Sequence, residues 1–292
     1  MTQETLLKTD QMIDFVRDGF IRFDAIVPDE INRDFLALYV RDAMDETTAR
    51  RDLPIVPAGT PLREAYPEDS PPAKILALPA IAGAIKSLVG PNPRFDHQAL
   101  HFREPNQPIS QMLHSDAMID ARREAFDIQL MYYPHDVDRE MGGTLVVPGS
   151  HTRRSNEATI ARYQNLIGQV QLVGKAGTVL ILHHNIWHAG RQNRSDRPRS
   201  MFKIRINPTV QQSGHWDMSD YEPEEARAGR PLYSAALSHD DVQGRLAKLN
   251  PWADCRGEHL DLIQRTKLWQ LLSGDPKFTI HHWADRVENI PR

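Results

Sequence analysis

The middle of the sequence is a succession of short apolar stretches separated by turn residues. Between Arg94 and Pro208 these stretches have alternating or continuous apolar character and are bounded by Pro, Gly, Asp and Asn, as strands and turns typically are. Because no long helix separates them, they favour an antiparallel double-sheet barrel, a jelly roll, over a parallel α/β sheet. The predicted strands cover residues 95–103, 111–118, 126–133, 143–147, 170–173, 178–183 and 200–207.

The segments on either side of this barrel are predicted to be mainly helical. A first helix, capped by Thr9 or Asp10, ends at Gly19, and a third covers residues 79–89 before Gly90. Between them, a second helix behind Asp29 has apolar residues at helical spacing, namely Ile31, Phe35, Leu38 and Tyr39. Residues 53–72 are Pro-rich and charged and are expected to form a loop. Near the C-terminus an amphipathic helix ending at Gly274 is marked by Leu260, Ile263, Leu268, Leu271 and Leu272.

Length and composition are those of an ordinary globular chain. The 292 residues are 40% hydrophobic and 25% charged, so the chain can bury a full-sized core. We therefore expect one domain over residues 1–292, mainly β with flanking α-helices. Its parts would be an N-terminal helical flank (1–93), the jelly-roll core (94–208) and a helical or irregular extension (209–292).

The charge pattern and the cysteine count limit the possible partners. The formal net charge is -4 and no Lys/Arg-rich run occurs, so neither nucleic acid nor an anionic membrane is an expected partner, and a small molecule is favoured. Cys255 is the single cysteine and cannot form an internal disulfide. The N-terminus lacks the apolar stretch of a secretory signal, so a cytoplasmic protein is expected. Nothing in the sequence determines its oligomeric state.

The first candidate for chemistry is His114-Ser115-Asp116. Residues two apart on a strand project from the same face, so this imidazole and this carboxylate could bind one ion together. Taken alone, the motif is also compatible with a surface histidine and aspartate on a half-buried strand.

The second candidate is His188, in the segment from Gly177 to Gly190. A buried apolar strand runs into a turn at His184-Asn185 and re-enters at Trp187-His188, so His188 could add a ligand from a neighbouring strand. Two histidines and one carboxylate form the facial triad of non-haem iron(II) sites. A structural core histidine is the alternative for His188, and His183 is its natural rival as a ligand.

A third signal is the arginine-rich stretch that follows His188. Residues 191–199 read RQNRSDRPR, and a predicted strand resumes at Ser200. An arginine here could form a two-pronged salt link with a dicarboxylic acid, which lysine cannot match in geometry. Individually, Arg191, Arg194 and Arg197 are as expected for a solvated loop.

Together these motifs resemble the phytanoyl-CoA dioxygenase family. The resemblance rests on His114-x-Asp116, on the GGTLVVPGSH segment at residues 142–151 and on the WHxGxxNxSDxxR segment at residues 187–199. The motifs occur in the family's order, and the match spans roughly residues 10–208.

The resemblance implies an Fe(II)- and 2-oxoglutarate-dependent dioxygenase on a double-stranded β-helix. By position, the family's metal ligands correspond to His114, Asp116 and His188, and its 2-oxoglutarate arginine corresponds to Arg199. Thr144 and Gln111 match positions that contact the cosubstrate. Family halogenases lack the ligand carboxylate. Its presence here implies that O2 is used to hydroxylate a C–H bond of a small molecule, or for a related oxidation, with release of succinate and CO2.

Two alternatives come from other functional classes. A cupin-like metalloenzyme, an isomerase or hydrolase, would keep the three ligands without needing Arg199. A non-catalytic jelly-roll binding module would use the same polar residues structurally or to contact a ligand directly.

Overall fold

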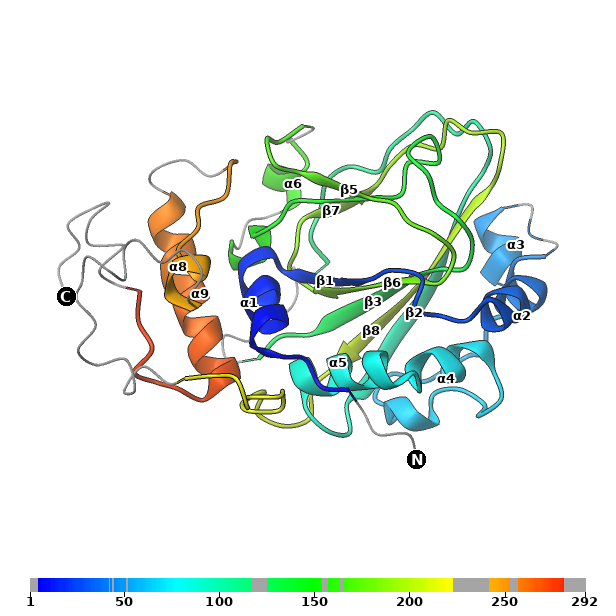
Figure 1. Cartoon of the computed structure of the whole chain (residues 1–292). Coiled ribbons are helices and arrows are strands. Elements are labelled where there is room, and N and C mark those ends of the chain that lie inside the picture. Colours follow the sequence, from blue (N-terminus) through cyan, green and yellow to red (C-terminus); the bar gives the residue numbers. More distant parts are fainter. Residues whose placement is uncertain are drawn as a thin grey trace.

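Two antiparallel sheets form the centre of the molecule (Figure 1). The computed structural model describes residues 5–41, 43, 45–50, 52–116, 125–153, 157–162, 165–222, 242–252 and 257–280. The larger sheet has the strand order β1-β6-β3-β8-β2 and the smaller has the order β5-β4-β7. The strands are β1 (Phe20–Phe23), β2 (Arg94–Arg103), β3 (Ile128–Tyr133), β4 (Thr144–Val146), β5 (Val170–Leu172), β6 (Thr178–His183), β7 (His188–Gly190) and β8 (Arg199–Asn207).

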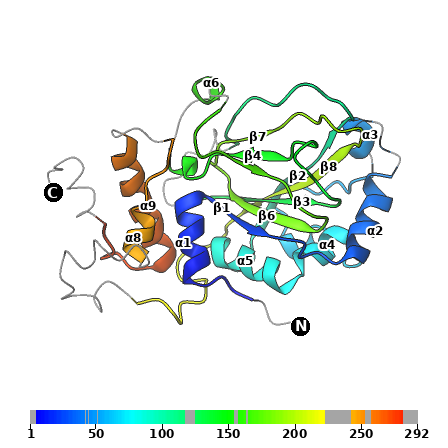
Figure 2. The same cartoon turned by 45° about the horizontal axis from the view of Figure 1, so that its top comes forward.

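Helices surround this pair of sheets. Figures 1 and 2 show α4 and α5 beneath the larger sheet, α2 and α3 at one end and α1, α8 and α9 at the other. The helices are α1 (Thr9–Asp18), α2 (Asp29–Tyr39), α3 (Glu46–Arg50), η1 (Leu62–Glu64), α4 (Pro71–Leu76), α5 (Pro79–Val89), η2 (Ser150–Thr152), α6 (Glu157–Ile160), α8 (Val242–Leu246) and α9 (Gly257–Ser273). The architecture is the predicted one, mainly β with flanking helices and a jelly-roll core.

Six of the seven predicted strands are found, with ends shifted by no more than about two residues. The exception is 111–118, of which residues 117 and 118 lie outside the described part. Residues 111–116 make only an isolated bridge, between His114 and His188, and the Gln111 N–H donates to the Gly190 carbonyl (2.8 Å). Between these two pairings, three residue steps from Gln111 to His114 therefore lie opposite two residue steps from Gly190 to His188. This is the count of a β-bulge, which breaks the ladder and is frequent beside active sites.

β1 was not expected, because the sequence around it favoured helix. Only four residues long, it lies between α1 and α2 and pairs with β6, with Phe20 opposite Leu182. The N-terminal flank thus contributes an edge strand to the larger sheet.

The predicted helices are present, with corrections at their ends and faces. Lys8, rather than Thr9 or Asp10, is the N-cap residue of α1, whereas Gly19 ends the helix in the left-handed region (φ 84°) as its lack of a side chain allows. Residues 53–72, expected to be a loop, contain η1 and the start of α4.

α9 packs against α1, α8 and η2. Leu260, predicted to lie on the apolar face, is 58% exposed. The buried face of α9 is therefore rotated about the helix axis from the predicted one, and it includes Leu262, Arg265, Trp269 and Leu272. A buried arginine explains the error: the Arg265 guanidinium donates to the carbonyls of Leu246 and Lys248 and occupies a position that a purely apolar face would exclude.

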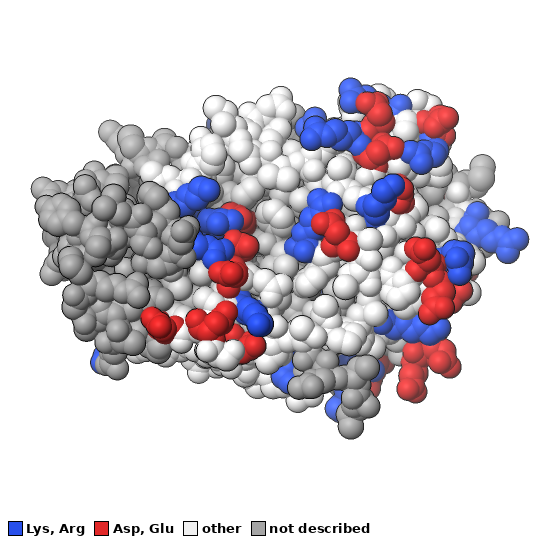
Figure 3. All heavy atoms as spheres, in the orientation of Figure 1, with Lys and Arg blue, Asp and Glu red and all other residues white. Residues whose placement is uncertain are grey.

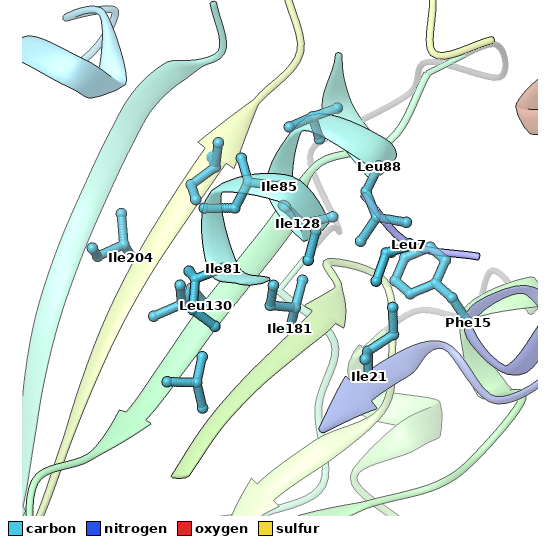
Figure 4. Packing of buried hydrophobic residues seen from close by; sticks show 14 of the residues in the cluster. Leu7, Phe15, Ile21, Ile81, Ile85, Leu88, Ile128, Leu130, Ile181 and Ile204 are labelled. Carbon is cyan, nitrogen blue, oxygen red and sulfur yellow. The ribbon is translucent and has the colours of Figure 1, made fainter. Parts of the chain in front are cut away.

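The main core lies between α5 and the larger sheet. Figure 4 shows Ile81, Ile85 and Leu88 of α5 against Ile128, Leu130, Ile181 and Ile204 of β3, β6 and β8. Since successive side chains on a strand alternate between faces, the remaining residues of these strands point between the two sheets. On β8 the inward residues are Arg199, Met201, Lys203 and Arg205.

Leu130→Ala is expected to lower the free energy of unfolding by about 2–5 kcal/mol, because it leaves a cavity in a fully buried position. Leu38→Ala is the control: it lies on α2 with a residue exposure of 54%, so its effect should stay within about 0.5 kcal/mol. Urea unfolding of both variants measures the difference. Equal losses would contradict this assignment of the core.

His151 gives the fold an acid-sensitive element. Its Nε2 lies 3.1 Å from the Val16 carbonyl at the end of α1, and burial, together with the Arg265 charge, lowers the pKa of His151 to about 3. Below the ordinary pKa of about 6.5, His151 binds a proton in the unfolded chain but not in the folded chain. The free energy of unfolding therefore falls as pH falls from 6.5 towards 3.

His151→Gln should therefore reduce the slope of unfolding free energy against pH by about 1.4 kcal/mol per pH unit between about pH 4 and 6. Chemical unfolding of wild type and variant across this range measures the slopes. Parallel curves would show that His151 is not kept neutral by the fold.

Charged side chains do not separate by sign on the face seen in Figure 3, where Lys and Arg lie among Asp and Glu. Among the described helices, none combines the length and the apolar character that a membrane span requires.

Candidate functional site

His114 and His188 face each other across the bridge between the 111–116 segment and β7. Each backbone N–H donates to the other's carbonyl, at 3.0 and 2.9 Å, and the ring centroids are 4.4 Å apart. The strand that ends at His183 and the turn after it thus return His188 to the edge of the smaller sheet, opposite the His-x-Asp motif.

Both histidines are oriented as metal ligands are. Nδ1 of His114 lies 2.9 Å from the Met112 carbonyl and Nδ1 of His188 lies 3.0 Å from the Ile186 carbonyl. A carbonyl can only accept, so each Nδ1 carries the proton and each Nε2 presents a lone pair. This tautomer is the one that a metal ion requires.

Asp116 completes the set. Its Oδ1 is 3.5 Å from Nε2 of His114 and its Oδ2 is 3.5 Å from Nε2 of His188. One ligand atom from each residue lies within 4.8 Å of the other two, which allows all three to reach one ion. Two imidazoles and one carboxylate are the donors of the facial triad, so the residues present fit a non-haem iron(II) ion.

The charges of the site keep it ready to bind a cation. Burial alone would raise the pKa of Asp116, but His188, Lys203 and His114 hold it well below its usual range, so the carboxylate is ionised. Burial lowers the pKa of His188 to about 4, although the negative charge of Asp116 acts to raise it, so the imidazole is neutral near neutral pH. Metal binding therefore needs no further deprotonation of these two groups.

His183, the rival ligand, lies on the other side of the sheet. Its ring stacks on Phe126 (centroids 4.8 Å apart, planes 18° apart), and its Nδ1 accepts from the Asn185 N–H at 3.0 Å. On β6 His183 shares the face of Val179 and Ile181, which pack in the helix-covered core, so it points away from the space between the two sheets.

Lys203 is a residue of the site that sequence reasoning missed. Its ammonium group donates to Asp116 Oδ2 at 2.9 Å, and its side chain is only 10% exposed. The signal was present in the strand at 199–207, where basic residues at positions 199, 203 and 205 alternate with the apolar residues 202, 204 and 206. This alternation places the charges on one face.

Arg199 begins β8 directly opposite Arg103 of β2 and is 5% exposed. Its Nη1 donates to the Met141 carbonyl at 2.5 Å. Burial lowers the pKa of Arg199 to about 10, opposed by Tyr133 and reinforced by Arg103, and the group stays charged at neutral pH. The guanidinium groups of Arg103 and Arg199 are therefore neighbours and can together bind an anion.

Gly190 shows where the polar groups converge. A Cβ on this glycine would lie 3.2 Å from Arg103 Nη2, 3.4 Å from Gln111 Oε1 and 3.7 Å from Arg199 Nη2. Gln111 Oε1 also accepts from the Gly190 N–H at 3.1 Å, while its Nε2 is 3.5 Å from His114 Nε2. Gln111 therefore lies between the histidine pair and the arginines.

Thr144 lies on β4 directly opposite Gly190 and is 4% exposed. Its hydroxyl accepts from Tyr133 OH at 3.1 Å, a phenol whose pKa burial raises. Thr144, Gln111 and Arg199 thus come from three segments and meet around one residue of β7.

Other polar residues near these strands have structural contacts. Gln98 accepts from Tyr66 OH (2.7 Å) on the helix-covered face of β2. Arg194 and Arg197 form exposed ion pairs with Glu140 and Asp138, as expected for a solvated loop.

Two antiparallel sheets around a site of two histidines and a carboxylate define the class of non-haem metal proteins built on a double-stranded β-helix. The sequence model of the family described as phytanoyl-CoA dioxygenase (PhyH) matches residues 15–201, and the chain belongs to this family. It is therefore one of the iron- and 2-oxoglutarate-dependent oxygenases. No curated protein matches the sequence.

Several solved structures share the fold at low identity. The non-haem α-ketoglutarate-dependent carbocyclase SnoK from nogalamycin biosynthesis is 20% identical, with a TM-score of 0.53 over 77% of this chain and 93% of SnoK. EctD from S. alaskensis, with 2-oxoglutarate and 5-hydroxyectoine, is 19% identical, with a TM-score of 0.53 over 71% of this chain and 78% of EctD. EvdMO1 is 20% identical, with a TM-score of 0.51 over 69% of this chain, which spans half (50%) of EvdMO1.

Proposed function

We propose that the protein hydroxylates a C–H bond of a small molecule, with Fe(II) held by His114, Asp116 and His188 and 2-oxoglutarate anchored by Arg199. The observation that carries the metal assignment is the pair of Nδ1 contacts to backbone carbonyls, 2.9 and 3.0 Å, which turn both Nε2 atoms towards Asp116. Three protein ligands leave positions open for the cosubstrate and O2.

The iron, when bound, supplies the activation of O2 that is coupled to oxidative decarboxylation of 2-oxoglutarate to succinate and CO2. The protein supplies binding and orientation. The two carbonyl-held imidazoles fix the direction of their lone pairs, and Lys203 holds one oxygen of Asp116 by a charge-assisted hydrogen bond.

The anchor for 2-oxoglutarate is the buried guanidinium of Arg199. Its planar donors match a carboxylate in two-pronged geometry, and burial strengthens the attraction because little water screens it. Thr144 and Gln111 lie beside it around Gly190, where a hydroxyl and an amide can donate to the other oxygens of the cosubstrate.

Hydroxylation is the proposed outcome because Asp116 fills the ligand position that family halogenases leave open. EctD, crystallised with 2-oxoglutarate and a hydroxylated compound, favours the same outcome, whereas SnoK is a carbocyclase of similar fold. Reaction under ¹⁸O2 separates these outcomes, since hydroxylation places one labelled oxygen in the product and ring closure places none.

The purified protein with Fe(II) and ascorbate is expected to convert 2-oxoglutarate slowly into succinate even without a prime substrate. The assay follows succinate with and without added iron, and a chelator serves as control. Absence of metal-dependent succinate formation would contradict the proposal and favour a metalloenzyme that does not use 2-oxoglutarate. A protein that retains no stoichiometric iron would favour a binding module.

A further inference from the structure

A second group of buried polar side chains lies beside Asp116, apart from the groups around Gly190. Measured over the whole residue, the exposed fraction is 0% for Gln129 of β3, 2% for His184 after β6 and 8% for Lys203 of β8. Arg205 of β8 adjoins them, with an 18% exposed side chain. Polar side chains are rarely buried this deeply without partners that satisfy them.

The register of the sheet places these side chains together. Gln129 is directly opposite Arg205, and Lys203 is opposite the next inward residue of β3, Met131. Gln129 and Lys203 are therefore diagonal neighbours on one face, within reach of long side chains. The His184 N–H donates to the Asp127 carbonyl at 2.9 Å, and its ring interacts electrostatically with Asp116, Lys203 and Arg205.

Two of these groups lack partners among the described residues. Neither the amide oxygen nor the amide nitrogen of Gln129 has a hydrogen bond there, and Nδ1 of His184 has none. Leaving a buried polar group unsatisfied destabilises the fold, so such groups point to a ligand that satisfies them.

The charge balance selects the kind of ligand. Arg205 is matched by Asp127, with Nη2 2.5 Å from Oδ2. Burial lowers the pKa of His184 to about 3, so this ring is neutral. Lys203 donates to Asp116 Oδ2 with one N–H, and its ammonium group has two more N–H groups to donate to an anion.

We infer that the prime substrate carries one carboxylate group, which Lys203 binds together with the Gln129 amide and His184. This inference rests on the proposed function, because it treats Asp116 as a metal ligand. The positive charge of Lys203 favours an anion, and the ammonium and amide donors fit the oxygens of a carboxylate. Lys203 lies four residues from Arg199, roughly 13 Å along the strand, so this anchor is separate from that of 2-oxoglutarate. A carboxylate bound here would hold the neighbouring carbons of the substrate beside the metal ligands.

The test uses the anaerobic protein saturated with Fe(II) and 2-oxoglutarate. A panel of aliphatic, aromatic and amino-substituted monocarboxylic acids is titrated calorimetrically, each beside its primary amide. At least one acid is expected to bind about tenfold more tightly than its amide, since a buried charge-assisted contact is worth more than 1.4 kcal/mol. If no acid binds more tightly than its amide, the inference is wrong.

Variants identify the anchor. Gln129→Leu and Lys203→Met should each reduce the acid-to-amide ratio about tenfold, whereas Met131→Leu, on the same inner face, should leave it unchanged. Gln129→Leu should also keep or raise Tm, because it removes an unsatisfied buried amide. A lower Tm with an unchanged ratio would mark Gln129 as structural and overturn the inference.

The succinate assay without prime substrate distinguishes a failure of the carboxylate inference from a failure of the proposed function. Metal-dependent succinate from the wild type with no preference for acids would overturn this inference alone. Absence of succinate would overturn the proposed function, and the calorimetric comparison of acid and amide would still decide whether Lys203, Gln129 and His184 bind a carboxylate.

Discussion

His188→Ala is expected to lower metal-dependent succinate formation by more than about a hundredfold. Loss of a residue that merely supports a ligand costs about 10–100-fold in metal affinity or activity, so loss of a ligand should exceed that range. The variant leaves His114 and Asp116 as two donors on one side of the ion, too few to hold it at micromolar concentration. Iron content after desalting and the rate of succinate formation are the two measurements.

The matched control is His97→Ala, which removes a histidine whose side chain is 47% exposed on β2. Its iron content and rate should equal those of the wild type. Stoichiometric iron in His188→Ala, with a near-normal rate, would contradict the assignment of His188 as a ligand.

Arg199→Met is expected to weaken 2-oxoglutarate binding by roughly a hundredfold or more. Removing one partner of a buried charge pair typically costs 2–5 kcal/mol, and 1.4 kcal/mol is a factor of ten in Kd. Iron should still bind, because within the described part of the chain Arg199 makes no hydrogen bond or ion pair with any of the three metal ligands. Anaerobic titration of the iron-loaded variant with 2-oxoglutarate measures Kd.

Arg197→Met is the control for this variant. Arg197 lies two residues earlier, with a 55% exposed side chain paired to Asp138, so its loss should leave Kd unchanged. An unchanged Kd in Arg199→Met would transfer the anchoring role to another cation, and Arg103, directly opposite Arg199, would be the first to test.

The sequence was informative where a short-range pattern determines the structure. Period-two apolar alternation predicted most strands, and the WHxGxxNxSDxxR segment predicted that His188 returns to meet His114 and Asp116. Pairs of residues two apart on extended chain share a face whatever the partner strand is, which is why the His-x-Asp inference survives although residues 111–116 do not form a regular strand.

Contacts between segments that are distant in the sequence could not be predicted from local sequence patterns. The short strand β1 joins the sheet only because β6 offers it an edge, and its local sequence carries no such information. The partnership of Lys203 with Asp116 spans 87 positions, and a basic residue in a strand is more often solvated than buried. The buried arginine of α9 similarly depends on carbonyls from another helix.

A structure of the protein with Fe(II) and 2-oxoglutarate, grown without oxygen, tests the metal assignment most directly. We predict one iron ion coordinated by Nε2 of His114, Nε2 of His188 and an oxygen of Asp116, with the far carboxylate of 2-oxoglutarate on the Arg199 guanidinium. Iron bound elsewhere, or bound without one of these three side chains, would contradict it.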